Sequence, residues 1–142
     1  MDKTDLARRC AETMYANDAA SRALGIRVDV PAAGRANATM TVRADMVNGF
    51  DVCHGGLLFT LADTAFAFAC NGYDDRTFAA AASIDFLRPA HLGDDLRAQA
   101  REDYRGSKSG FYSVEICNQD GDVVAVFRGR SASRGERVLV EA

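Results

Sequence analysis

Residues 54–73 read HGGLLFTLADTAFAFACNGY, and this stretch decides the fold. Its composition predicts a helix that is apolar on nearly every side instead of along one stripe. The single charged residue within it is Asp63. Such a helix needs protein around it, so we expect the rest of the chain to surround it. Its apolar residues are Leu57, Leu58, Phe59, Leu61, Ala62, Ala65, Phe66, Ala67, Phe68 and Ala69.

The segments on either side of this stretch predict what surrounds the helix. Before it, residues 4–24 have helical spacing, with Thr4 as N-cap and Gly25 as the stop, and from Gly34 polar and apolar residues alternate as in a half-buried strand. After it come four further strands, with Asp120-Gly121 as a tight hairpin turn. We place them at 78–87, 95–105, 110–118 and 122–131. This order predicts an α+β fold, an antiparallel sheet wrapped around one long helix.

The bulk composition fits one compact domain spanning residues 1–142, in which 1–24 form an N-terminal helical segment. The formal net charge is -3, and acidic and basic residues are mixed along the chain, so a nucleic-acid partner is not expected. The longest apolar run is too short to span a bilayer, and no apolar segment follows the polar N-terminus. We therefore expect a cytoplasmic protein without a membrane partner.

The four cysteines show no C-x-x-C spacing, so we interpret them as free thiols instead of disulfides. The only histidines are His54 and His91. Two histidines without paired cysteines do not favour a zinc site, and we predict no metal.

Gly55 and Gly56 stand at the start of the long helix. The first amides of a helix have no acceptor within it, and no side chain covers the backbone of a glycine. The start of a helix also carries a partial positive charge, which attracts anions. The Gly55 N–H is therefore a candidate donor to an oxyanion. The alternative is that the glycines only allow close packing.

Asp63 is the second candidate. An unpaired carboxylate in an apolar environment costs several kcal/mol, and its neighbours at helical spacing offer no opposite charge. The alternative is a buried carboxylate that is satisfied by backbone amides, by Thr60 or by Thr64. The functional interpretation is a general base or nucleophile that faces a cleft.

The spacing of these two candidates has a consequence for assembly. Asp63 follows Gly55 by eight residues, which is roughly 12 Å along a helix. Both groups of one chain therefore cannot reach one carbonyl carbon. A reaction that needs both would take the donor from one subunit and the carboxylate from another, so the spacing predicts a dimer.

Three residues of the preceding loop are further candidates. Asn48 could position a water molecule or hold the loop as part of an ordinary Asn-Gly turn. His54 could orient the loop, bind the substrate or cap the helix. Cys53 beside His54 does not favour a nucleophilic dyad, because adjacent side chains diverge and no third orienting residue is evident.

These residues resemble a known family. Asn48-Gly49, His54-Gly55-Gly56, Phe59 and Leu61-Ala62-Asp63, continued by residues 83–90, Gly93-Asp94 and the hairpin from Gly110 to Gly129, are similar to hotdog-fold acyl-CoA thioesterases of the phenylacetic-acid-degradation type. The resemblance covers about residues 24–131. It implies a hotdog fold, dimers whose sheets join edge to edge, and tetramers built from two dimers.

The resemblance also implies roles for residues. Asp63 is the expected base or nucleophile, Gly55 the oxyanion donor, and Asn48 and His54 are expected to assist them. Ser83 is expected near the carboxylate. For substrate binding, the resemblance and the residues together point to Gly56, Phe59, Arg88, Lys108, Ser109 and Gly110, with the basic residues meeting the phosphates of coenzyme A. The alternative for the basic turn is a solvated surface.

The predicted activity is hydrolysis of an aryl- or medium-chain acyl-CoA, for example phenylacetyl-CoA or a hydroxylated derivative. A thiolate leaves readily, so no cofactor is expected, and coenzyme A is part of the substrate. Phe50, Phe59 and Phe66 are candidates for an acyl pocket, although helical spacing also favours plain core packing. The alternatives are a non-catalytic acyl-CoA-binding protein and a hotdog hydratase or dehydratase, for which a second well-placed histidine is missing.

Overall fold

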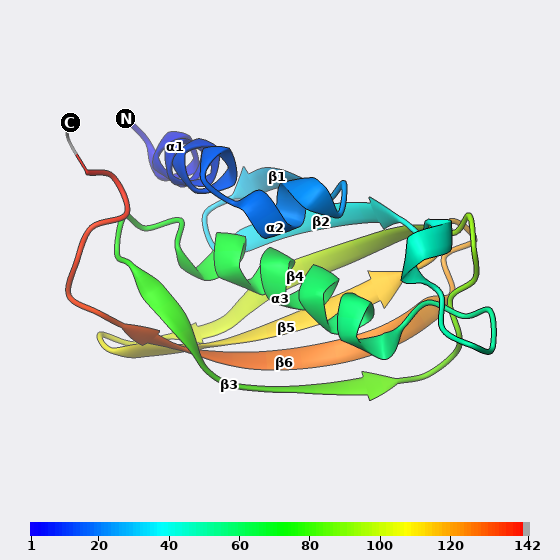
Figure 1. Ribbon diagram of the computed structural model, residues 1–142. Coiled ribbons are helices and arrows are strands. Elements are labelled where there is room, and N and C mark those ends of the chain that lie inside the picture. The colour runs from blue at the N-terminus through cyan, green and yellow to red at the C-terminus, as the bar shows by residue number, and fades with distance from the viewer. Residues whose placement is uncertain (141–142) are drawn as a thin grey trace.

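The computed structural model describes residues 1–140; residues 141–142, the last of the predicted domain, lie outside the described residues. The elements follow the predicted order of helix, two strands, long helix and four strands (Figure 1). They are α1 (Lys3–Ala16), α2 (Ala19–Ala23), β1 (Arg27–Ala32), β2 (Arg35–Thr41), the 3-10 turn η1 (Ala44–Met46), α3 (Gly55–Cys70), β3 (Thr77–Phe86), β4 (Asp95–Arg105), β5 (Ser109–Cys117) and β6 (Val123–Ser133).

The strands form one antiparallel sheet in the order β1-β2-β4-β5-β6-β3, and α3 lies along one of its faces (Figure 1). Side chains along β4 alternate: Leu96, Ala98 and Ala100 are buried against α3, while Arg97 and Gln99 are exposed on the other face. We call the face that carries α3 the inner face and the opposite face the outer face. The predicted α+β architecture is confirmed, and the core lies between α3 and the inner face.

The long helix is held at both ends. His54 caps its start, and Asn71 caps its end by donating from its side-chain amide to the Ala67 carbonyl at 2.9 Å while accepting from the Thr77 N–H at 2.9 Å. Most of α3 is buried, as predicted. Beyond its first turn, however, Phe59, Thr60, Asp63 and Ala67 keep some exposure. Their spacing of three or four residues puts them on one side of the helix, so the single chain leaves the side that carries Asp63 partly open.

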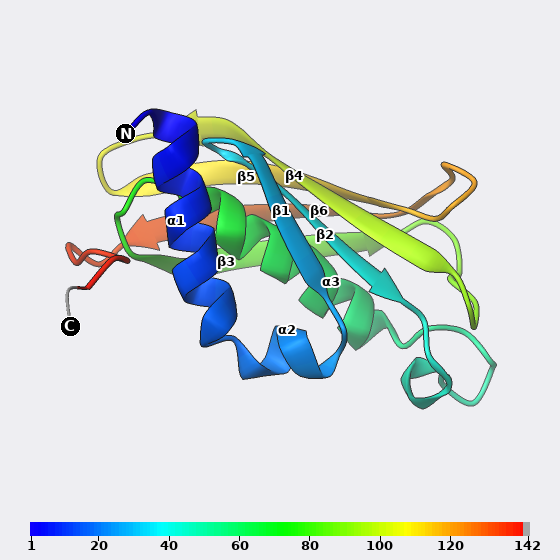
Figure 2. The same cartoon turned by 90° about the horizontal axis from the view of Figure 1, so that it is seen from above.

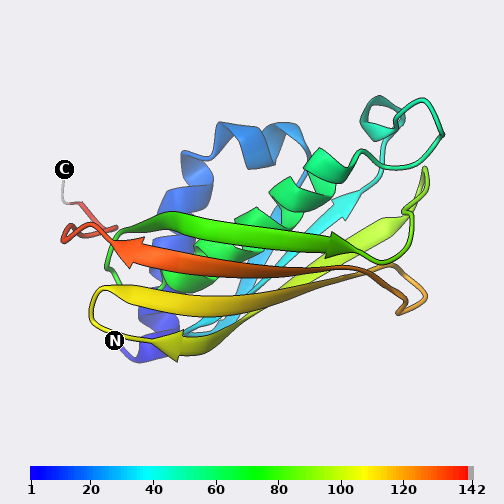
Figure 3. The ribbon, with the colours of Figure 1, turned by 90° about the horizontal axis from the view of Figure 1, so that it is seen from below.

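The two edge strands of the sheet differ. Every residue of β3 is exposed or half-buried although most are apolar, and among the described residues 1–140 β3 is hydrogen-bonded on one side only, to β6 (Figure 3). At the other edge α1 lies beside β1 (Figure 2). From α1, the Arg8 Nε donates to the Val30 carbonyl at 3.1 Å, and the Tyr15 hydroxyl donates to the Ile26 carbonyl at 2.6 Å. The β1 edge is therefore covered within the chain, and the β3 edge is open.

The single N-terminal helix predicted over residues 4–24 is wrong in two details. It is broken into α1 and α2 at Asn17-Asp18, and its N-cap is Asp2, which accepts from the Asp5 N–H at 2.8 Å, instead of Thr4. Asp18 caps α2 by accepting from the Ser21 N–H at 3.0 Å. Short polar side chains compete for backbone groups in this way and favour helix ends. Gly25, at φ +71°, follows the last helical turn as expected.

The four strands after α3 fall within two residues of their predicted bounds, and β4 matches them. The turn between β5 and β6 is wider than a two-residue hairpin: the Asn118 N–H donates to the Asp122 carbonyl at 3.0 Å, and the Asn118 side chain accepts from the Asp120 and Asp122 N–H groups. Gly121 supplies the positive φ within it. Across residues 1–140, no helix has the length and hydropathy to cross a membrane.

Candidate functional site

The loop between η1 and α3 is fixed by Asn48. Its side-chain oxygen accepts from the Phe50 N–H at 2.9 Å and from the Val52 N–H at 3.4 Å, while its own N–H donates to the Val52 carbonyl at 2.8 Å. These bonds stabilise Asp51 at φ +60°, a conformation that non-glycine residues seldom adopt. Asn48 therefore holds the loop, as one of its two predicted roles requires, and its side-chain NH₂ donates to no acceptor among residues 1–140.

The first turn of α3 leaves one amide unused. The Gly56 N–H donates to His54 Nδ1 at 3.3 Å, and the Leu57 N–H donates to the His54 carbonyl at 2.9 Å. For the Gly55 N–H, the described part of the chain provides no acceptor. His54 is thus the helix cap, one of its predicted alternatives, and Gly55 presents a free donor at the positive end of the helix.

Asp63 is half-buried on the open side of α3. Within residues 1–140 no hydrogen bond or ion pair reaches its carboxylate, and desolvation by burial raises its pKa. The two threonines proposed as partners are occupied elsewhere: the Thr60 hydroxyl donates to the Gly56 carbonyl at 2.9 Å, and the Thr64 hydroxyl donates to the Thr60 carbonyl at 2.7 Å. Within residues 1–140, the alternative of a carboxylate satisfied by backbone amides or by these threonines is therefore not met.

The helix that carries Gly55 and Asp63 is continuous over Gly55–Cys70. Eight residues of α-helix separate the two groups by about 12 Å along the axis. A single chain therefore cannot bring both to one carbonyl carbon, as the spacing predicted.

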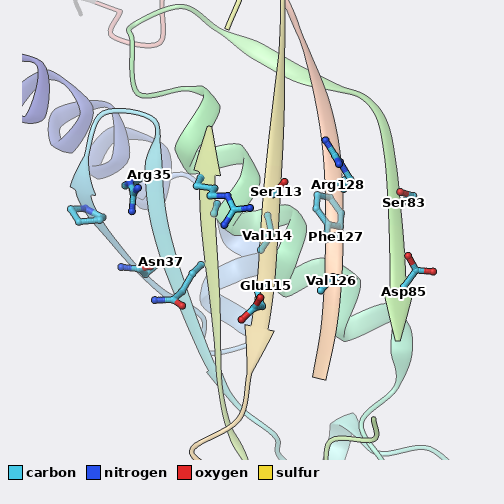
Figure 4. A pocket seen from close by; sticks show the side chains of 14 residues that line it. Arg35, Asn37, Ser83, Asp85, Ser113, Val114, Glu115, Val126, Phe127 and Arg128 are labelled. Atoms are coloured by element: carbon cyan, nitrogen blue, oxygen red, sulfur yellow. The ribbon is translucent and has the colours of Figure 1, made fainter. Parts of the chain in front are cut away.

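Ser83 lies away from Asp63 within the chain, and the expectation that it is near the carboxylate is corrected on this point. It is paired with Arg128 of β6, and cross-strand partners point to the same face of a sheet. Both side chains line a groove of about 510 Å³ on the outer face, together with Asp85, Ser113 and Glu115 (Figure 4). α3 lies on the inner face, so the sheet separates Ser83 from Asp63. Successive side chains of a strand point to opposite faces of the sheet. A shift of one residue in the register of β3 would therefore move Ser83 to the inner face.

The basic residues expected at the phosphates of coenzyme A lie at opposite ends of the sheet. The Arg88 N–H bonds to the Val124 carbonyl near the start of β6, and Arg88 Nη1 pairs with Asp122 at 3.2 Å. The Lys108 carbonyl accepts from the Ser133 N–H at the end of β6. Val124 and Ser133 are nine residues apart along β6, which is roughly 30 Å of strand. One chain therefore cannot direct both to the same phosphate.

The other residues predicted around the β4–β5 turn differ in exposure. Ser109 is half-buried and its carbonyl accepts from the Gly106 N–H at 2.8 Å, which closes the turn. Gly110 is buried, and a Cβ there would lie 2.9 Å from the Tyr112 ring. Gly110 therefore serves close packing on the inner face, and Lys108 is the exposed charge of the turn.

The three phenylalanines considered for an acyl pocket have different environments. Phe66 is 1% exposed and contacts Tyr112 and Phe127, so it belongs to the core. Phe59 is half-buried on the open side of α3, with its ring edge against Phe127. Phe50 is 87% exposed at the tip of the loop that Asn48 holds. Phe50 and Phe59 are therefore accessible to a ligand, and Phe66 is not.

The cysteines are free thiols, as predicted. Cys53 is buried, burial raises its pKa, and its thiol approaches the His54 carbonyl instead of the imidazole. A Cys53–His54 dyad is therefore not formed. No group of histidine, cysteine and carboxylate side chains within residues 1–140 has the arrangement of a metal site.

Sequence reasoning missed Phe86. This residue ends β3, and its ring lies against Gly55. The alternation of Ala82, Ile84 and Phe86 along β3 carries the signal that could have placed the ring on the inner face. The contact between Phe86 and Gly55 joins residues 31 positions apart, so sequence spacing could not predict it.

Comparisons with known proteins match the same segments. Residues 50–125 match the family model described as Thioesterase superfamily. Acyl-coenzyme A thioesterase PaaI of Escherichia coli (strain K12) is 49% identical over 132 residues, covering 93% of this chain and 94% of that protein. The solved structure of the E. coli PaaI protein aligns with a TM-score of 0.94 and 47% identity, covering 96% of this chain and 99% of that one. A mutant of the phenylacetic acid degradation protein PaaI from Thermus thermophilus aligns with a TM-score of 0.76 and 35% identity, covering 79% and 96%.

Proposed function

The chain belongs to the thioesterase superfamily and has its hotdog fold, as the sequence resemblance predicted, and from this premise we propose its reaction. The enzyme is an acyl-CoA thioesterase that hydrolyses an aryl- or medium-chain acyl-CoA, such as phenylacetyl-CoA or a hydroxylated derivative, to the free acid and coenzyme A. The observation that carries the proposal is that α3 offers two groups unpaired within residues 1–140, the Gly55 N–H and the Asp63 carboxylate.

In the proposed reaction, Asp63 takes a proton from water as the hydroxide adds to the thioester carbonyl carbon. The carbonyl oxygen becomes an oxyanion and accepts from the Gly55 N–H at the positive end of α3. The C–S bond then breaks, and the coenzyme A thiolate leaves and is protonated by solvent. In the nucleophilic version, the Asp63 carboxylate adds to the carbon itself, the C–S bond breaks with departure of the coenzyme A thiolate, and water then hydrolyses the mixed anhydride to the free acid and the Asp63 carboxylate.

The proposed site contains two subunits. The open, apolar β3 edge supports a dimer in which two sheets join through β3, because an unpaired strand of this kind is a template for another strand. A two-fold axis across antiparallel strands puts the end of one β3 beside the start of the other. Gly55 and Arg88 of one chain then share one end of the joined sheet with the Lys108 turn of the partner. Pairing of two dimers into a tetramer is also proposed from the resemblance.

The neighbouring residues have assisting roles in this proposal. The side-chain NH₂ of Asn48 is available to orient the attacking water or the carbonyl, and His54 fixes the start of α3 through Gly56. Phe59 and Phe50 are the apolar surfaces offered to the acyl group. No metal or redox cofactor takes part in the proposed hydrolysis, and the cytoplasmic location remains a prediction.

Thiol release from a panel of acyl-CoAs tests the proposal. Wild-type protein should release coenzyme A from at least one aryl- or medium-chain ester, and Asp63→Asn should lower kcat by about 10³-fold, since the amide can neither accept the proton nor attack. Asp120→Asn, in the exposed β5–β6 turn, is the matched control and should retain wild-type rates. A wild type that binds acyl-CoA without turnover would favour the acyl-CoA-binding alternative, and hydration of an enoyl-CoA without thiol release would favour the hydratase.

A further inference from the structure

The ring of Phe86 lies on the Cα of Gly55. A Cβ built on Gly55 would be 3.1 Å from the Phe86 Cζ, closer than ordinary van der Waals contact, and 3.4 Å from its Cε1, at the lower limit of such contact. Phe86 is paired with the buried Ala125 of β6, so its side chain points to the inner face, where α3 begins. The last residue of the open edge strand thus contacts the first residue of the helix that carries the oxyanion donor.

This contact explains why residue 55 is glycine. Gly55 does not have a positive φ, so the backbone itself would accept a side chain there. The next residue, Gly56, has its nearest neighbour at 3.5 Å, an ordinary contact. The space beside Gly55 is filled by the Phe86 ring, so the glycine fits a close approach by that ring and not a turn.

Phe86 is not a core residue in the chain. Its side chain is 54% exposed, while Ile84, two residues earlier on the same face, is half-buried against the core. Within the single chain, this half-exposed ring therefore contributes little to the core, and its contact there is with the start of α3. In the single chain the ring lies at the helix start instead, beside the Gly55 backbone whose N–H has no acceptor within residues 1–140.

We propose that Phe86 is a positioning residue for the oxyanion donor: it fixes the start of α3 and shields the Gly55 N–H from water. The inference rests on the proposed function. A donor in a water-excluded site stabilises a developing negative charge more than one that competes with solvent. Because Phe86 ends β3, the same ring links the strand through which the dimer is proposed to form to the amide that acts in the reaction.

The role predicts a specific kinetic signature. A donor that acts on the developing oxyanion affects the transition state more than the bound substrate, so loss of its shield lowers kcat and leaves KM nearly unchanged. The fold loss is the same for every acyl group, since each thioester has the same carbonyl. A residue that only lines the acyl pocket would give a loss that grows or shrinks with the size of the acyl group.

The test uses Phe86→Ala, Phe86→Leu and Phe111→Ala, the last being an exposed phenylalanine on the outer face. Phe86→Ala is expected to lower kcat about tenfold, with KM within about twofold, for two acyl-CoAs of different size. Phe86→Leu, which still covers Gly55, should retain most of kcat, and Phe111→Ala should keep all of it. The dimer content and Tm of each variant are measured alongside, so that loss of assembly is separated from loss of the shield.

A double-mutant cycle with Gly55→Ala makes the contact itself measurable. Gly55→Ala should lower kcat in the wild-type background, where the new methyl meets the ring, and should cost less in the Phe86→Ala background, where the space is free. Multiplicative effects of the two changes, an unchanged kcat in Phe86→Ala, or a loss that depends on acyl size would each overturn the inference. An inactive wild type would instead overturn the proposed function, and the inference with it.

Discussion

The two edge strands of the sheet, β1 and β3, differ in whether the chain itself covers them. At β1 the chain closes its own edge: Arg8 and Tyr15 of α1 occupy carbonyls there, and Pro31 lacks an N–H that could pair with another strand. At β3 nothing within residues 1–140 covers the edge, although it is ten residues long and mostly apolar. A long, exposed, apolar edge is an aggregation hazard for a monomer. The β3 edge can therefore pair with a strand of a second subunit, and the β1 edge cannot. Gly55 lies near the β3 edge, against Phe86.

The largest expected effect comes from blocking the open edge. Ala81→Lys places a charge in the middle of β3, where a second copy would bring the same charge beside it. We expect a monomer and a loss of activity of about 10³-fold or more, because Gly55 and Asp63 of one chain cannot meet at one carbonyl. Analytical ultracentrifugation and thiol release measure the two effects.

Ala32→Lys, which puts the same change on β1, is the control for Ala81→Lys. It should alter neither assembly nor activity. A monomeric Ala81→Lys that keeps wild-type turnover would show that one chain suffices.

Removal of the oxyanion donor should have the next largest effect. Gly55→Pro deletes the N–H at the first helical position, where proline is well tolerated, and His54 at ψ 131° already has the conformation that a following proline requires. We expect kcat to fall about 10² to 10³-fold with the helix content preserved. Gly55→Ala is the control, because its methyl group meets the same Phe86 ring while its N–H is kept. Its kcat should fall much less than that of Gly55→Pro. Equal falls in kcat would mean that packing against Phe86, and not the lost N–H, causes the effect.

Ionisation of Asp63 should make the unfolding free energy depend on pH. Burial raises its pKa, so the folded protein holds that proton more tightly than the unfolded chain. The unfolding free energy of the wild type should therefore fall as the pH rises from its ordinary carboxyl pKa of about 4 through the raised value. Asp63→Asn should remove this decline and raise Tm at neutral pH, while kcat of the wild type rises over the same window.

Thermal denaturation of both proteins from pH 4 to 8 measures this difference. A wild type and Asp63→Asn with parallel Tm profiles would mean that the carboxylate gains an opposite charge in the assembled protein.

The smallest effect is expected at the closed edge. Arg8→Met keeps most of the apolar stem and removes the bond to the Val30 carbonyl. The cost should be about 1 kcal/mol of unfolding free energy, the usual contribution of one part-buried hydrogen bond. Turnover and dimer content should stay at wild-type levels. A shift toward higher oligomers would instead show that α1 actively protects β1.

The features that the sequence predicted share a physical origin. The apolar run of α3, the alternation of β2 and the turn residues are local signals, so the order of elements and the candidate pair Gly55 and Asp63 could be read from them. A single helix up to Gly25 does not allow for the break at Asn17-Asp18, where the Asp18 side chain caps a new helix by accepting from the Ser21 N–H.

The features that could not be predicted depend on contacts between distant segments. The expectation that Ser83 lies near the carboxylate is not met within the chain, because the register of β3 against β6 puts its side chain on the outer face. Charge alone favours a shared phosphate site for Arg88 and Lys108, whereas the hydrogen bonds of the sheet place them near opposite ends of β6. The fit of Phe86 on Gly55 joins an edge strand to a helix start, and no periodicity predicts such a contact.

Subunit mixing tests most directly whether each site is shared between two chains. Asp63→Asn and Gly55→Pro, each inactive alone, are refolded together at equal amounts, and formation of mixed dimers is verified by native mass spectrometry. Each mixed dimer contains one site with both groups intact and one with neither, and half of the dimers are mixed. A site shared by two subunits predicts recovery to about one quarter of the wild-type activity. Mixed dimers that form but stay as inactive as either parent would contradict a site built from two subunits.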